Sequence, residues 1–319
     1  MHLRPWLALL ALVLANLIWG GSYVAAKVAL AELSPSSLAF LRFALAAALS
    51  LPLVWRVRGD VRLEWRDAPA VALIGVAGVA VPYLVSYVGM NWTTASDSAL
   101  VVSAEPVFTV GLAVLFLGEP LGWRRVGALV LGVGGAYTIV SHGQGLASLL
   151  VSRQALGNSL VALSLLGEAG YTVLGKHVMR SYRPLVVTLY AVWIAAIILL
   201  PVSLITPALT HGGLTPHLVP WRLATWLALL YLSGGCTLGA YLLWNLALSR
   251  VQANVAGVFL FLQPVIGALL GVITLHEDLA PTTVVGALAV FGGLLLVSRS
   301  PASGIDERYV PVVRPQREK

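Results

Sequence analysis

Long apolar runs recur along the whole chain, and they limit its possible folds more than any short motif does. Ten windows of about 18 or more mostly apolar residues are long enough to cross a bilayer as helices. These windows are residues 6–26, 36–54, 69–90, 97–117, 123–140, 157–177, 185–205, 223–247, 252–274 and 281–298. Charged residues make up only 10% of the chain, against about 25% in soluble domains. We therefore predict an all-α integral membrane protein with ten transmembrane helices.

Lysine and arginine are distributed unequally between the two sets of connections. With the N-terminus inside, sixteen lie in the inner connections and the termini, whereas Lys27, Arg153 and Arg222 lie outside and Arg42 lies within a window. Cytoplasmic loops carry such an excess of basic residues. We expect a multi-pass protein of the plasma or inner membrane with both termini in the cytoplasm. This topology accounts for the net charge of +7, so the expected partner is the lipid bilayer and not a nucleic acid.

The sequence repeats itself once. Residues 95–125 return 158 positions later as 253–283, with Pro106/Pro264, Glu119/Glu277 and six further pairs identical. An offset of 149 aligns the starts of the two halves. Because each half has five windows, an odd number, the second half enters the membrane from the opposite side. We predict two inverted-topology five-helix repeats, 1–145 and 155–298, around a central cavity, with a disordered cytoplasmic tail at 299–319.

Glu105 and Pro106 stand together halfway along the fourth window. A carboxylate at that depth costs about 2.5–3.5 kcal/mol, and an interior proline costs about 3 kcal/mol. The second half has Gln263 at the position of Glu105, so only one half is ionisable there. Glu105, and likewise Glu168 in the sixth window, is either a proton-coupling group or a structural carboxylate hydrogen-bonded between helices. Pro106 and Pro264 are candidate hinges, with tolerated kinks as the alternative.

Polar and aromatic side chains recur at helical spacing in several windows. Since such faces cannot point at lipid, we expect them to surround a hydrated cavity for a small-molecule substrate. The candidate substrate-binding residues are Trp19, Tyr83, Tyr87, Glu105, Glu168, Tyr171, Tyr241, Trp244, Asn245 and Gln263. For Tyr83, Tyr241 and Trp244, a place in the interfacial aromatic belt is the alternative. Arg42 lies near the start of its window, and we expect it to snorkel to the outer surface and not to pair with a glutamate.

The stretches that could indicate catalysis or metal binding are incomplete or lie in the wrong structural context. His276-Glu277-Asp278 lacks the second histidine of the H-E-x-x-H motif. Gly132, Gly134 and Gly135 lie within an apolar window without a preceding strand, and small residues in such a window favour helix packing. The sequence therefore predicts no enzyme, no cofactor and no metal.

Several short stretches resemble a known family. Residues 15–27, ANLIWGGSYVAAK, are followed by Pro35 and by LRF at 41–43, and the blocks 95–127 and 253–286 each carry a mid-window proline and a later glutamate. In these features the chain is similar to the EamA-like branch of the drug/metabolite transporter superfamily. The resemblance covers nearly all of residues 1–298. It implies ten helices, two inverted repeats, a central cavity and the export or exchange of small metabolites, often amino acids.

The leading interpretation is a secondary transporter that exports small amphipathic metabolites such as amino acids by alternating access. Proton coupling through Glu105 and Glu168 is one form of it, and passive facilitation by the same fold is the other. A drug or nucleotide-sugar carrier of the same architecture is the alternative.

Overall fold

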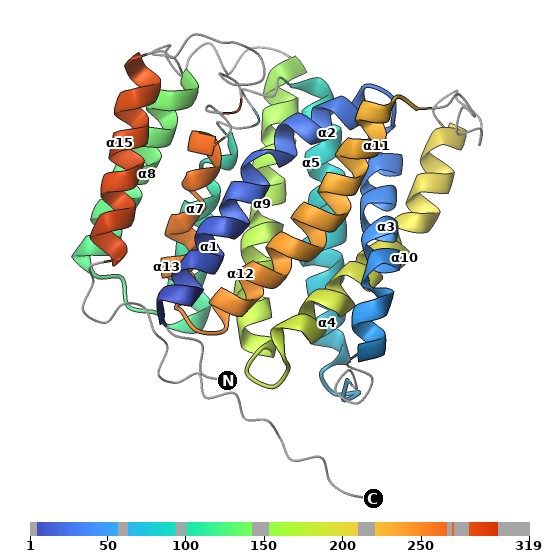
Figure 1. Ribbon diagram of the computed structural model, residues 1–319, viewed down its shortest axis with the longest axis horizontal. Coiled ribbons are helices and arrows are strands. Elements are labelled where there is room, and N and C mark those ends of the chain that lie inside the picture. Colours follow the sequence, from blue (N-terminus) through green and yellow to red (C-terminus); the bar gives the residue numbers. More distant parts are fainter. Residues whose placement is uncertain are drawn as a thin grey trace, which may run out of the picture.

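The protein is built from helices throughout the part that the computed structural model describes, which is residues 5–56, 63–93, 98, 101–141, 153–209, 221–266, 270 and 281–298. Figure 1 shows these helices arranged as one bundle. In chain order they are α1 (Pro5–Gly20), α2 (Ser22–Leu30), α3 (Pro35–Arg56), α4 (Ala68–Gly75), η1 (Val76–Ala80), α5 (Val81–Trp92), α7 (Glu105–Leu117), α8 (Trp123–Ser141), α9 (Arg153–Val178), α10 (Pro184–Leu209), α11 (Leu223–Leu230), η3 (Tyr231–Ala240), α12 (Tyr241–Leu248), α13 (Ala253–Phe259) and α15 (Pro281–Ser298).

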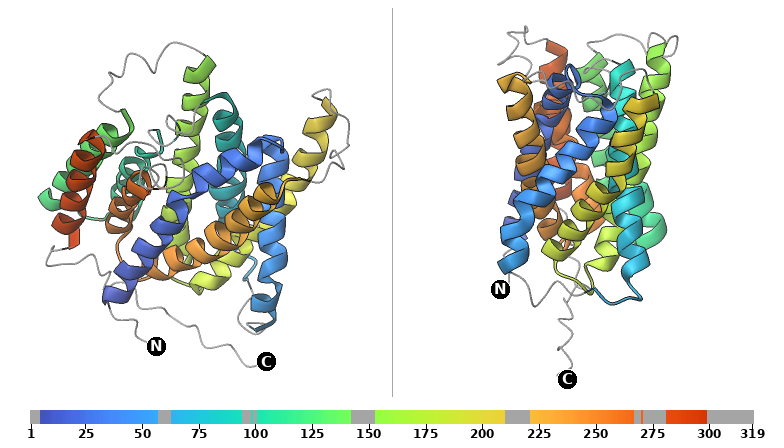
Figure 2. Two further views of the ribbon diagram at one scale, coloured as in Figure 1. Left: turned by 45° about the horizontal axis from the view of Figure 1, so that its top comes forward. Right: turned by 90° about the vertical axis from the view of Figure 1, so that its right-hand side faces the viewer.

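The described residues agree with the predicted all-α fold, and several of their helices are long and apolar enough to cross a membrane. Among the described residues, five helical stretches are long and apolar enough to cross a membrane, and they are Trp6–Leu30, Pro35–Trp55, Ala68–Trp92, Pro184–Thr206 and Leu223–Leu248. Shorter apolar helices cover Glu105–Leu117, Ala253–Ile266 and Val284–Leu296. The further views in Figure 2 show the helices side by side in the bundle. The predicted tail at 299–319 lies outside the described residues.

Proline and glycine mark several helix boundaries. Pro35, Pro184 and Pro281 are the first residues of α3, α10 and α15, a position where the missing N–H is not needed. Gly118 follows α7 with a φ of 61°, a left-handed conformation that glycine adopts without a steric penalty. These prolines and this glycine therefore set helix boundaries at connections of the bundle.

Two π-helical segments interrupt otherwise α-helical rods. η1 separates α4 from α5, and η3 separates α11 from α12. The offset of 158 maps residues 76–80 onto 234–238, which lie within η3. Such wide turns are frequent near functional sites. Here they occur at matched positions in the two halves of the chain.

Helices α8 and α15 lie side by side at one edge of the bundle (Figure 1). Their close approach depends on glycine, because a Cβ atom on Gly135 would come within 2.5 Å of the carbonyl oxygen of Gly286. Gly132 has a similar role, since its Cβ would meet the Phe261 ring at 2.3 Å. Gly134 has nothing within 4 Å of the same position. Helix packing is therefore the role of Gly132 and Gly135, as the sequence predicted, but not of Gly134.

Two lysines cap the C-terminal ends of helices α5 and α12. Lys27 Nζ donates hydrogen bonds to the carbonyl oxygens of Met90 and, at 2.6 Å, of Thr93. Lys176 Nζ donates to the carbonyl oxygens of Leu248, at 3.4 Å, and of Val251. The lysines are related by the offset of 149, and both pairs of acceptors are related by the offset of 158. The same capping arrangement therefore occurs twice, once in each half.

A buried ion pair joins the two halves at the end of the bundle where α13 begins. Glu119 Oε1 lies 3.7 Å from Lys176 Nζ, with both side chains 1% exposed. The Glu119 carboxylate also accepts hydrogen bonds from the backbone N–H groups of Ala253 and Asn254, both at 2.8 Å. Nearby, Arg125 Nη2 donates to Gln252 Oε1 at 2.6 Å. The connection between α7 and α8 is thereby fastened to the start of α13.

Another link at this end of the bundle joins the connections that precede α4 and α10. The Tyr182 hydroxyl donates to Asp67 Oδ2 at 2.7 Å and accepts from the backbone N–H of Glu64 at 3.1 Å. Partial burial, and then the hydrogen bond to Asp67, raise the pKa of Tyr182 above its ordinary value. The phenol therefore stays protonated as a donor across the physiological pH range.

Candidate functional site

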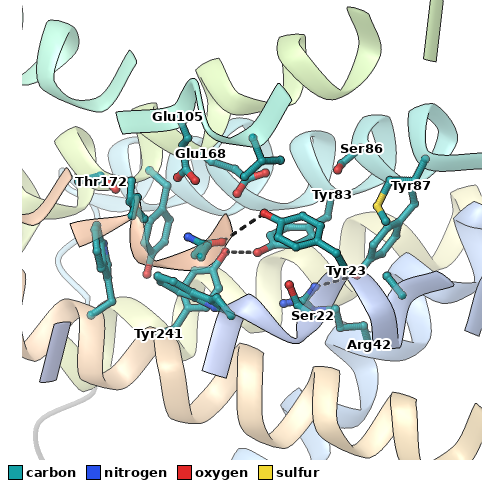
Figure 3. Close-up of a pocket in the computed structure, with 18 residues that line it drawn as sticks. Ser22, Tyr23, Arg42, Tyr83, Ser86, Tyr87, Glu105, Glu168, Thr172 and Tyr241 are labelled. Atoms are coloured by element: carbon teal, nitrogen blue, oxygen red, sulfur yellow. Dashed lines mark hydrogen bonds between the residues drawn. The ribbon is translucent and has the colours of Figure 1, made fainter. Parts of the chain in front are cut away.

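A cavity with an empty volume of about 700 Å³ lies in the middle of the bundle. Most of the elements that surround it come in matched pairs from the two halves of the chain. Figure 3 shows the polar side chains that project into it. It is lined by Trp19, Ser22, Tyr23, Ala26, Arg42, Tyr83, Ser86, Tyr87, Met90, Val102, Glu105, Glu168, Tyr171, Thr172, Tyr241, Trp244, Leu260 and Gln263.

Nine of the ten predicted binding residues line this cavity. Tyr83, Tyr241 and Trp244, for which the interfacial belt was the alternative, are among them. Asn245 is the exception. It is fully buried behind the cavity wall, where its Nδ2 donates to Tyr171 Oη at 2.6 Å and to Thr188 Oγ1 at 2.9 Å. Its amide thus orients a lining residue and does not itself face the cavity.

Two carboxylates face the cavity together. Glu105 is the first residue of α7, and Glu168 projects from the middle of α9 (Figure 3). They are close enough for their charges to interact. Within the described part of the chain, neither makes an ion pair within 4.0 Å or a hydrogen bond through its side chain. The N-terminal end of α7 offers Glu105 the positive end of a helix dipole.

Gln263, which replaces Glu105 in the second half, is already engaged. Its Oε1 accepts a hydrogen bond from the Tyr23 hydroxyl at 3.2 Å, and its Nε2 donates to Asn16 Oδ1 at 3.2 Å. Asn16 in turn donates to the carbonyl oxygen of Leu12 at 2.8 Å. The two equivalent positions therefore differ in contacts as well as in charge, since Gln263 is held in a network and Glu105 is not.

Aromatic rings form the apolar wall of the cavity. Trp19 packs against Tyr241 and Trp244, with ring centroids 5.6 and 5.4 Å apart, and Tyr171 packs edge-on against Tyr241 at 5.0 Å. The Tyr241 hydroxyl donates to the Tyr83 hydroxyl at 3.2 Å (Figure 3). Tyr83 and Tyr241 are equivalent residues of the two halves, so equivalent positions meet in the cavity.

Arg42 occupies a different place from the one expected. The expectation that it snorkels to the outer surface is wrong, because its side chain is only 2% exposed and turns into the cavity. Its Nε donates to Thr237 Oγ1 at 2.8 Å, and its Nη1 donates to the Tyr87 hydroxyl at 2.7 Å. Its guanidinium also lies over the Tyr83 ring, 4.2 Å from the centroid. These partners come from η3 and α5, helices whose positions the sequence of α3 alone does not reveal.

The two prolines stand beside helix breaks. Pro106 is the second residue of α7, directly after a turn at residues 103–104. Pro264 follows a turn at residues 260–261, which ends α13 at Phe259. The penalty for an interior proline therefore does not apply to Pro106, because a first-turn residue needs no N–H donor. Both breaks adjoin the cavity, since Glu105 and Gln263 precede the prolines.

Sequence reasoning did not commit to eight lining residues besides Arg42. They are Ser22, Tyr23, Ala26, Ser86, Met90, Val102, Thr172 and Leu260. The repeat offsets could have found two of them, Ser22 and Ser86, because these are equivalent to the predicted Tyr171 and Trp244. In all, fourteen lining residues form seven equivalent pairs. The pairs are Trp19/Glu168, Ser22/Tyr171, Tyr23/Thr172, Tyr83/Tyr241, Ser86/Trp244, Val102/Leu260 and Glu105/Gln263. Arg42 has the uncharged Ala191 as its counterpart.

Comparison with known proteins agrees with this architecture. The model of the EamA-like transporter family matches residues 6–141 and 155–299. A protein of Archaeoglobus fulgidus named as an uncharacterized transporter is 30% identical over 289 residues, which cover 91% of this chain and 96% of that protein. A solved structure, described only as a crystal structure of a protein, has a TM-score of 0.72 at 20% identity and covers 91% of this chain and 95% of its own, so it shares the fold.

Two relatives have more specific names. The "probable terminal-alkyne amino-acid exporter" of Streptantibioticus cattleyicolor is 26% identical, and the match covers 92% of this chain and 93% of that protein. The "probable amino-acid metabolite efflux pump" of Escherichia coli is 28% identical, with coverage of 89% of this chain and 92% of that protein. Both names describe carriers that move small molecules out of cells.

Proposed function

Because this chain belongs to the EamA-like transporter family, we propose that it is a secondary transporter that exports small amphipathic metabolites such as amino acids. The observation that carries the proposal is the central cavity, which has two carboxylates facing an aromatic wall. An amine can bind at the carboxylates while an apolar side chain packs against the rings. The names of the two amino-acid exporters among its relatives support the same substrate class.

The proposed architecture is ten membrane spans in two inverted five-helix repeats, 1–145 and 155–298. The duplicated lysine caps and the seven equivalent pairs of lining residues support it. Transporters of this kind alternate access by rocking one repeat against the other around a fixed central site. In this mechanism Pro106 and Pro264 are the hinges, because each follows a helix break beside the cavity. Both chain ends lie in the cytoplasm, and the protein resides in the plasma or inner membrane.

Glu105 is the proposed coupling residue. A cavity carboxylate without an ion-pair partner can take up a proton on one side of the membrane and release it on the other. Glu168 on α9 and Tyr23 on α2 are titratable groups that line the cavity with it. Glu168 has the weaker coupling role, because its equivalent in the first half is the neutral Trp19. It contributes mainly to the binding of the substrate amine.

The test is transport by the purified protein in proteoliposomes. Labelled metabolites are offered one at a time, with and without an imposed pH gradient, and empty vesicles serve as the control. We expect amino acids to be carried and a pH gradient to accelerate their movement. Transport of drugs or nucleotide sugars in place of amino acids would overturn the proposed substrate class. An amino-acid transport rate that does not depend on the pH gradient would indicate a passive facilitator.

A further inference from the structure

Arg42 is a buried cation without a bound anion in the described part of the chain. Two of its three guanidinium nitrogens are occupied by the hydroxyl groups of Thr237 and Tyr87. The third, Nη2, is buried and has no hydrogen-bond partner among the described residues. Leaving such a charged donor unpaired inside a protein is unfavourable, so a ligand that accepts from it is stabilised there. Arg42 therefore has one free, oriented donor at a position that lines the cavity.

The cavity glutamates do not neutralise this charge by direct contact. Neither Glu105 nor Glu168 lies within ion-pair distance, 4.0 Å, of Arg42. Figure 3 shows Arg42 on one side of the cavity and the two glutamates on another, with Tyr23 and Tyr83 between them. Opposite charges held apart in one cavity suit a molecule that carries both charges itself.

We propose that Arg42 Nη2 binds the carboxylate of the substrate while Glu105 and Glu168 bind its amine. The proposal rests on the proposed function, since it assumes that a metabolite occupies this cavity. It adds the identity of the specificity-determining residue and the requirement for a carboxylate. The Thr237 and Tyr87 hydroxyls fix the plane of the guanidinium, so the donor is preorganised for its ligand.

A carboxylate fits this site better than a phosphate does. Arg42 is the one cationic side chain among the described residues that line the cavity, so a dianion would leave a net negative charge beside two glutamates. The aromatic wall remains for the apolar side chain of the substrate, which gives the site three distinct parts.

The test compares phenylalanine with phenethylamine, which lacks only the carboxylate, as competitors of amino-acid transport in proteoliposomes. For the wild-type protein we expect phenylalanine to compete about 10- to 100-fold better, the factor that corresponds to a charged hydrogen bond of about 1.5–3 kcal/mol. In Arg42→Gln this ratio should fall to about 1, because competition by phenylalanine weakens while competition by phenethylamine does not depend on Arg42. Arg66→Gln, a change to an exposed arginine at the bundle surface, is the matched control and should keep the wild-type ratio.

The other outcomes distinguish an error in the assignment of Arg42 from an error in the proposed function. If wild-type protein transports amino acids but phenethylamine competes equally well, the assignment of Arg42 is overturned and the proposed function stands. The same holds if Arg42→Gln keeps the wild-type ratio. If Arg42→Gln does not fold, the wild-type comparison alone decides the matter. Stronger competition by the aminophosphonate analogue of phenylalanine would overturn the carboxylate assignment. If the wild-type protein carries neither compound nor any other metabolite, the proposed function itself fails.

Discussion

At the scale of single residues, Glu105 and Gln263 occupy equivalent positions but differ in chemistry and contacts. We predict that Glu105→Gln abolishes the dependence of transport on a pH gradient, because the amide keeps the shape of the side chain and loses the titration. Exchange down a substrate gradient should persist, since Glu168 still faces the cavity. The measurement is the initial rate in vesicles over a series of imposed pH gradients.

Glu168→Gln is the companion variant for this experiment. We expect it to weaken substrate binding, seen as a higher KM, while the response to the pH gradient remains. Loss of the gradient response in Glu168→Gln but not in Glu105→Gln would reverse the two roles. A wild-type response to the pH gradient in both variants would show that neither carboxylate takes part in coupling.

At the scale of helices, the neighbouring glycines of α8 provide a matched pair of substitutions. Gly134→Ala should raise thermal stability slightly, since alanine is favoured over glycine in a helix by about 1 kcal/mol and nothing lies within 4 Å of the new atom. Gly135→Ala should lower it, because the same atom would come within 2.5 Å of the Gly286 carbonyl oxygen. Unfolding of the purified variants in detergent measures both effects. Equal shifts for the two variants would contradict the close packing of α8 on α15.

The ion pair between Glu119 and Lys176 fastens α9 and α13 to the connection after α7. We predict that Lys176→Met destabilises the protein by about 3–5 kcal/mol, the usual effect of removing one partner of a buried pair. The remaining Glu119 would be a buried carboxylate that accepts from two backbone donors and has lost the lysine charge. Thermal unfolding in detergent measures this, and Arg66→Met, which removes an exposed ion pair, should have little effect. Similar stabilities for the two variants would show that the buried pair contributes little.

At the scale of the whole molecule, the proposed inverted repeats require a particular topology. Reporters fused after Arg62 and after Lys319 should be cytoplasmic, whereas one inserted at residues 206–221 should be external. The excess of lysine and arginine in the inner connections is the physical reason. Activity of a paired cytoplasmic and external reporter at each site measures this. An external C-terminus would refute the ten-span arrangement.

The sequence by itself determined the class of the protein and the location of its helices. The preference of a helix for the bilayer depends on its own sequence, because any helix of about 20 apolar residues favours the bilayer whatever surrounds it. The windows therefore overlap the apolar helices of the structure, and the family was evident from short motifs that the family comparison confirms. Many of the residues that line the cavity could also be predicted, since polar residues in such helices must avoid lipid. Nine of the ten chosen residues do line it.

The tertiary structure alone decided how these residues are used. Arg42 has the same local sequence whether it points outward or inward, and the Thr237 and Tyr87 hydroxyls on neighbouring helices hold it inward. Asn245 has a polar side chain like the lining residues, yet Tyr171 and Thr188 bind it behind the wall. These outcomes depend on partners far apart in the sequence, because a buried polar group points to wherever its hydrogen bonds can be satisfied.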